Sequence, residues 1–99
     1  MKPRQTKDIQ KVLLKKGFKL NPNKDHHQFY YLTVDDVKHP VYTYLSHGKK
    51  EYNKNLMGEI KKQLKFNSTE KAEDFFDCPM SAEQYVDMLI EQKDITINE

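Results

Sequence analysis

The sequence predicts an α+β fold in which helices cover one face of a single antiparallel sheet. Apolar residues recur at helical spacing near both ends, and aromatic and β-branched residues cluster in the middle, where Asp35-Asp36 separates two such clusters. A chain of 99 residues has room for one modest core. We therefore expect one domain over residues 1–66, with a helical extension over residues 67–99 packed on or near it.

Residues 6–16 are expected to form the first helix. Thr6 is a suitable N-cap, and Ile9 and Leu13 follow at helical spacing. Gly17 then ends the helix, because glycine readily adopts the left-handed conformation that follows many helix C-termini.

Three strands are expected next. Phe18 and Leu20 form a short first strand, and residues 26–34, rich in aromatic and β-branched side chains, form the second. A turn occupies residues 35–40. Residues 41–46 then alternate between two faces, which predicts a third strand with one buried side. The two longer strands form an antiparallel hairpin.

A second helix is expected from about residue 53 to residue 65, where Leu56 and Ile60 lie one turn apart. Capping-box patterns at residues 67–70 and 81–84 predict two short helices at the end of the chain. The whole is a two-layer α-β-β-β-α sandwich with a C-terminal helical extension. The double-stranded RNA-binding fold has the same order of elements.

The two parts of the chain carry opposite charge. Residues 1–66 contain 15 Lys and Arg against 6 Asp and Glu, whereas residues 67–99 contain 2 Lys against 9 Asp and Glu. A basic first part is the electrostatic signature of a polyanion binder. The acidic tail is either a solvated helical appendage or a segment that folds against the basic part. Two solvated surfaces of opposite sign explain the pattern equally well.

The composition excludes several classes of protein. No apolar run approaches the roughly 20 residues that span a bilayer, and the N-terminus lacks the apolar stretch of a signal peptide. The lone Cys78 excludes an internal disulfide framework and fits a reducing compartment. We expect a cytoplasmic protein with no membrane contact. No metal-ligand spacing is present, so neither a metal nor a cofactor is expected.

Three of the four histidines lie in two clusters. His26-His27 begins the second strand, and His47 ends the third, so the hairpin brings one of the pair close to His47. Histidine titrates near neutral pH, which suits it to proton transfer. RNA carries its own nucleophile, the 2′-hydroxyl, so a base and an acid suffice for cleavage. Lys49 and Lys50 would stabilise charge on the phosphorane.

Several segments resemble HicA-type mRNA interferase toxins. The segment Asp25-His26-His27-Gln28-Phe29 resembles their Gly-Ser-His-His or Gly-Ser-Asn-His segment, and Lys11-Val12-Leu13-Leu14-Lys15-Lys16-Gly17-Phe18 resembles their first helix. The loop Ser46-His47-Gly48-Lys49-Lys50-Glu51 resembles their arginine-histidine-glycine-lysine-glutamate loop, and residues 56–64 resemble their closing helix. The resemblance covers roughly residues 7–66.

The resemblance implies a double-stranded RNA-binding-like fold, ribosome-independent cleavage of mRNA without metal, and inhibition by a HicB-type antitoxin. It places the catalytic histidine on His27. Lys24-Asp25 replaces the family's Gly-Ser, and the added carboxylate would raise the pKa of a neighbouring histidine. The chain is also similar to a divergent HicA-like group, through Asp25-His26, Ser46-His47-Gly48, Cys78-Pro79 and Tyr85.

Strand alternation leaves the choice between His26 and His27 open, because their side chains point to opposite faces. If Phe29 faces the core, His27 does too, and His26 shares the open face with Tyr30 and two tyrosines of the third strand. The family match favours His27, which we rank first. The candidates for RNA contact are Lys16, Lys24, Lys49, Lys50, Lys54, Tyr30, Tyr42 and Tyr44.

Two functions remain open at this point. The first is a HicA-like toxin of a type II toxin-antitoxin system, a metal-independent RNase with His27, His26 or His47 in the catalytic role. The second is a binding module of the same fold that has lost cleavage and holds RNA or a protein partner. The substitution of Lys24-Asp25 for Gly-Ser favours the second.

Overall fold

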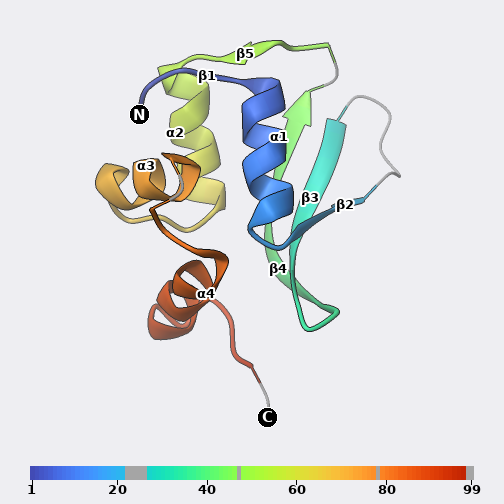
Figure 1. Ribbon diagram of the computed structural model, residues 1–99, viewed down its shortest axis with the longest axis vertical. Coiled ribbons are helices and arrows are strands. Elements are labelled where there is room, and N and C mark those ends of the chain that lie inside the picture. Colours follow the sequence, from blue (N-terminus) through green and yellow to red (C-terminus); the bar gives the residue numbers. More distant parts are fainter. Residues whose placement is uncertain (22–26, 47, 78, 98–99) are drawn as a thin grey trace.

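The computed structural model describes residues 1–21, 27–46, 48–77 and 79–97, and it has an α+β architecture (Figure 1). A three-stranded antiparallel sheet packs against helices, as expected for this class. The elements are β1 (Arg4–Gln5), α1 (Thr6–Lys15), β2 (Phe18–Asn21), β3 (His27–Val34), β4 (Val37–Ser46), β5 (Glu51–Tyr52), α2 (Lys54–Gln63), α3 (Thr69–Asp77) and α4 (Ala82–Glu91).

The main sheet has the strand order β2-β3-β4. β3 and β4 form the expected hairpin, but their connection is tighter than predicted. Asp35 and Asp36 have positive φ angles of 50° and 66°, so these two residues alone reverse the chain and β4 begins at Val37. The prediction of a turn extending to Pro40 is wrong. Pro40 lies within β4, an edge strand where a missing N–H is tolerated, and the register shifts opposite it.

A second, two-stranded sheet was not expected from the sequence. Its strands β1 and β5 pair antiparallel, with Arg4 opposite Tyr52. Beside it, the Thr6 hydroxyl donates a hydrogen bond to the Lys49 carbonyl at 2.5 Å, and the Thr6 N–H donates to the Lys50 carbonyl at 2.9 Å. The predicted N-cap role of Thr6 is therefore wrong, since Gln5 occupies that position. Thr6 instead fastens the start of α1 to residues 49–50.

α1 and α2 form as the sequence predicts, with bounds that differ by at most two residues. Ile9 and Leu13 are buried beneath α1, which ends before Gly17 at a φ of +98°. In α2 the Asn53 side chain accepts a hydrogen bond from the Leu56 N–H at 2.9 Å and so caps the helix.

The acidic extension is part of the single core and not a detached appendage. Tyr85 of α4 is fully buried, and its ring lies 5.9 Å from that of Phe18 and 4.8 Å from that of Phe75. Its hydroxyl donates a hydrogen bond to the Leu64 carbonyl at 2.8 Å, which ties α4 to the end of α2. The ring of Phe66 lies 5.3 Å from that of Tyr85 and completes this aromatic centre.

The predicted capping box at α4 is confirmed, whereas the cap of α3 lies one residue later than predicted, on Ser68 in place of Asn67. Ser68 accepts a hydrogen bond from the Lys71 N–H at 3.1 Å at the start of α3. At α4, Ser81 accepts from the Gln84 N–H at 3.1 Å while the Gln84 side chain accepts from the Ser81 N–H at 2.8 Å, which is a complete capping box.

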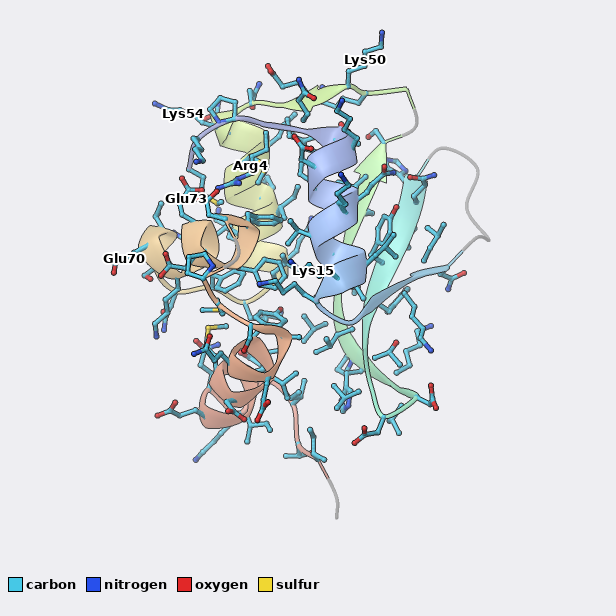
Figure 2. The ribbon with its side chains drawn as sticks, in the orientation of Figure 1. Arg4, Lys15, Lys50, Lys54, Glu70 and Glu73 are labelled. Carbon is cyan, nitrogen blue, oxygen red and sulfur yellow. The ribbon has the colours of Figure 1, made fainter. Side chains whose placement is uncertain are left out.

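The basic N-terminus and the acidic extension meet at Arg4, whose side chain points towards Glu73 (Figure 2). The guanidinium lies 2.7 Å from Glu73 and 3.0 Å from Asp77, and its central carbon is 5.2 Å from the centroid of the Phe76 ring. The hydrogen bond from Arg4 lowers the pKa of Asp77. This contact supports the prediction that the acidic tail folds against the basic part, and not the alternative of a solvated appendage.

None of the helices in the described ranges is both long and apolar enough to span a membrane.

Candidate nucleic-acid interface

The two faces of β3 are the reverse of what strand alternation suggested. Tyr30 is 2% exposed and Leu32 is fully buried, so these residues face α1 and the core. The Gln10 amide on α1 donates a hydrogen bond to the Gln28 side chain at 2.7 Å, which marks the same face. The prediction that Tyr30 lies on the open face is therefore wrong, and burial raises the pKa of its hydroxyl.

The opposite face of the sheet carries a cluster that we call the open aromatic face, formed by His27, Phe29, Tyr31, Tyr42 and Tyr44. Tyr42 and Tyr44 are 40% and 38% exposed, and the three residues of β3 are partly exposed. α1 packs on the other side, the one towards the viewer in Figure 1. Within the described residues, the open aromatic face is thus the broad apolar surface that the helices leave uncovered.

The rings of this face form a continuous row. His27 lies 4.9 Å from Tyr44, Tyr44 lies 5.3 Å from Phe29, and Phe29 lies 6.0 Å from Tyr42, measured between ring centroids. Tyr42 stacks on Tyr31 at 5.1 Å with an interplanar angle of 28°. Because each ring supports the next, the side chains are held in place before any ligand arrives, which reduces the entropy lost on binding.

Lysines flank the end of the row nearest the tight turn. The Lys38 ammonium lies 3.9 Å from the centroid of the Tyr31 ring, a cation–π distance. Lys19 lies 3.3 Å from the Asp36 carboxylate, and both side chains are well exposed. A hollow of about 320 Å³ lies between these groups and Tyr31. Positive charge and ring surface therefore occur together here.

His27 is the single member of the predicted histidine set that the structure describes. It pairs with Ser46 in the β3–β4 ladder, and its ring meets Tyr44 edge to face. His26, His47 and Lys24 lie outside the described residues. His27 and Phe29 share one face of β3, as strand alternation requires, but this face is the open aromatic face and not the core.

The remaining predicted lysines divide into two groups. Lys16 is 3% exposed, and its ammonium donates a hydrogen bond to the Met80 carbonyl and lies 5.4 Å from the Phe75 ring. Lys16 is therefore absent from the surface that RNA could reach, and its role is to hold the extension against α1. Lys49, Lys50 and Lys54 are exposed, and Figure 2 shows Lys50 and Lys54 well apart.

A second surface feature, which we call the basic cleft, adjoins the far end of the aromatic row. It encloses about 570 Å³ between the first turn of α1, the ends of β3 and β4, and residues 48–51. Lys7, Lys49 and Lys50 line it, against one carboxylate, Glu51. The described residues include no group of three or more His, Cys, Asp or Glu that could hold a metal ion.

Comparison with known proteins returns no family model, no curated protein and no solved structure that matches this chain.

Sequence reasoning missed several members of this surface. The sequence leaves the orientation of Phe29 and Tyr31 open, because aromatic residues occupy both faces of β3 and either face could be the buried one. Lys38 was placed in a turn, and Lys7 was overlooked because its cleft depends on the unexpected β1–β5 pairing. In the sequence, the apolar Leu32 next to the polar Thr33 favours the face of β3 that carries Leu32 as the buried one, and Leu32 is indeed fully buried.

Proposed function

We propose that this protein binds single-stranded RNA on its open aromatic face, as a HicA-like domain with the double-stranded RNA-binding-like order of elements. The carrying observation is the continuous row of rings from His27 to Tyr31 on an uncovered sheet face. Unpaired bases stack on such rings with little sequence preference, and each stack contributes about 1–3 kcal/mol.

Single strands suit this face better than duplexes do. In a duplex the bases are stacked on one another and their faces are inaccessible, whereas a single strand can turn its bases towards the protein. Tyr42 and Tyr44 are partly exposed, so their ring faces are accessible to a base. Lys38 and Lys19 lie beside the row, where their charges can pair with the backbone of a strand whose bases lie on the rings.

Apart from the two-residue β5 between β4 and α2, the order α1-β2-β3-β4-α2 is the α-β-β-β-α order of the double-stranded RNA-binding fold, which supports the fold component of the proposal. The fold itself carries no function. The extension adds to that order by supplying Phe75 and Tyr85 to the core. A HicB-like antitoxin is the protein partner that the HicA resemblance implies. An adjacent reading frame for a small HicB-like protein is the observation that tests this pairing.

Cleavage is the second candidate, and the position of His27 favours it. Its imidazole lies on the open aromatic face beside Tyr44, so a strand bound to the rings would pass next to it. As a general base His27 would take the proton of a 2′-hydroxyl, whose oxygen attacks the adjacent phosphorus. The leaving 5′-oxygen takes a proton from a second group, and a 2′,3′-cyclic phosphate is left.

The proposal is tested by titrating the full chain with a fluorescent single-stranded RNA and with a hairpin duplex, at about 50 and 200 mM salt. We expect tighter binding of the single strand and weaker binding at the higher salt. Equal affinity for the duplex, or no binding of either, contradicts the proposal.

The same RNA, incubated with wild type and His27→Ala, separates binding from cleavage. Cleavage that His27→Ala abolishes supports the RNase. If the wild type binds the RNA without cleaving it, the result supports an RNA-binding module and contradicts the RNase hypothesis.

A further inference from the structure

The basic cleft has a lining that suits an anion. Three of its lining residues are lysines and one is a glutamate, so the charge around it is positive. The first turn of α1 forms one wall, and Gln5, at the N-cap of that helix, makes no side-chain capping hydrogen bond. The positive end of the helix dipole adds to the field of the lysines there.

The position of the basic cleft links it to the open aromatic face. Ser46 lines the cleft and pairs with His27 across the β3–β4 ladder. A smaller hollow of about 240 Å³ lies next to it and is lined by Tyr44, Ser46 and Lys49. Lys49 and Ser46 therefore line both hollows, and Tyr44 belongs to the aromatic row. The basic cleft, which Gln10 and Gln28 line on the α1 side of the sheet, is thus connected to Tyr44 at the end of the row through the second hollow.

The walls of the basic cleft are held in place by hydrogen bonds that its lining residues make. The hydrogen bonds from Thr6 to the carbonyls of Lys49 and Lys50 fix residues 49–50 against α1. The Ser46 N–H donates a hydrogen bond to the Tyr52 hydroxyl at 2.7 Å, and the Gln10–Gln28 hydrogen bond joins α1 to β3. These bonds connect all the segments that form the cleft, so it is a preformed site.

We infer that the basic cleft is a phosphate-binding subsite, which takes a phosphate of the RNA strand at the His27 end of the aromatic row. This inference rests on the proposed function for its ligand, since the strand reaches the cleft only if its bases occupy the rings. The subsite would define the direction in which the RNA strand runs along the rings, and Lys7 and Lys49 would fix the position of the strand. Phosphate contacts of this kind set register and orientation, whereas the rings hold the bases.

The first experiment uses the isotopically labelled full chain and inorganic phosphate, with sodium chloride at matched ionic strength as the control. We expect phosphate to shift the amide signals of Thr6, Lys7 and residues 48–50. Lys7→Gln and Lys49→Gln should each weaken this binding about two- to fivefold. The matched control is Lys11→Gln, which removes the same charge one turn along α1, outside the cleft, and should leave phosphate binding unchanged.

The second experiment measures the salt dependence of single-stranded RNA binding for the same variants. Lys49→Gln should reduce the slope of log affinity against log salt by about one, whereas Lys11→Gln should leave it unchanged. A terminal phosphate and an internal one are distinguished by comparing short RNAs with 5′-phosphate, 3′-phosphate and no terminal phosphate. A preference for one phosphorylated end that Lys49→Gln removes identifies a terminal group. Equal binding of all three, with the reduced slope, identifies an internal one.

The failures of the two proposals differ. Phosphate shifts at the cleft in a chain that binds no RNA would support an anion site and overturn the assignment to an RNA phosphate. RNA binding that moves neither the cleft signals nor the salt slope of Lys49→Gln would overturn the subsite and leave the open aromatic face intact.

Discussion

Tyr85 offers the sharpest test of the claim that the acidic extension belongs to the core. Its ring contacts aromatic residues contributed by β2, α3 and the segment after α2, and its hydroxyl binds the Leu64 carbonyl. Two substitutions separate these contributions. Tyr85→Phe keeps the ring and removes one hydrogen bond, whereas Tyr85→Ala removes both.

The magnitudes follow from burial. Tyr85→Phe leaves the buried Leu64 carbonyl without its donor, at a cost of about 1–3 kcal/mol. Tyr85→Ala also opens a cavity at a fully buried aromatic site, and such changes cost about 3–5 kcal/mol before the hydrogen bond is counted. In a domain of this size each kcal/mol lowers the melting temperature by about 4–8 °C.

Urea unfolding followed by circular dichroism measures both free energies. The control is Tyr44→Phe on the open aromatic face, which should change the free energy of unfolding by no more than about 0.5 kcal/mol. Unfolding of Tyr85→Ala at the wild-type urea concentration would refute the reasoning. A Tyr85→Phe cost equal to that of Tyr44→Phe would refute the energetic role assigned to the hydroxyl.

Three further outcomes are expected. The Arg4 hydrogen bond lowers the pKa of Asp77 in the folded state, so the pair stabilises the protein at neutral pH. The difference in unfolding free energy between wild type and Asp77→Asn, measured with urea, should therefore shrink as the pH falls through the carboxyl range. A difference that stays constant down to pH 2 would contradict this prediction. Gly17→Ala forces a side chain into a left-handed conformation and should cost about 1–2 kcal/mol in thermal unfolding, whereas Gly58→Ala, in α2 with open space around it, should cost nothing. Ser81→Ala removes a complete capping box and should cost about 0.5–2 kcal/mol; no loss would show that α4 does not depend on its cap.

The elements with strong local signals were predicted well from the sequence. α1 ends before Gly17 and Ser81 caps the start of α4 as expected, because a left-handed glycine and a capping box are encoded within a few neighbouring residues. The β1–β5 pairing was missed because each strand is two residues long, too short for an alternation pattern, and it depends on contacts between segments far apart in the chain.

The candidate site was predicted in part. Tyr42 and Tyr44 lie on the open face as expected, since Val41 and Leu45 mark the opposite side of β4 as the buried one. Tyr30 was misplaced because β3 is aromatic on both faces, so its sequence does not define which face is buried. Lys16 was misassigned because the partners that bury it, Phe75 and Met80, come from the extension.

The central claim is that the open aromatic face binds single-stranded RNA, and the most direct test is the affinity of the double variant Tyr42→Ala/Tyr44→Ala. The two rings are partly exposed, so their removal should leave the fold intact, which circular dichroism can verify. Loss of one or two base stacks predicts an affinity at least about fivefold weaker in fluorescence anisotropy, while Leu14→Ala, an exposed apolar control on α1, should bind as wild type. Wild-type affinity in a folded Tyr42→Ala/Tyr44→Ala variant would contradict the account.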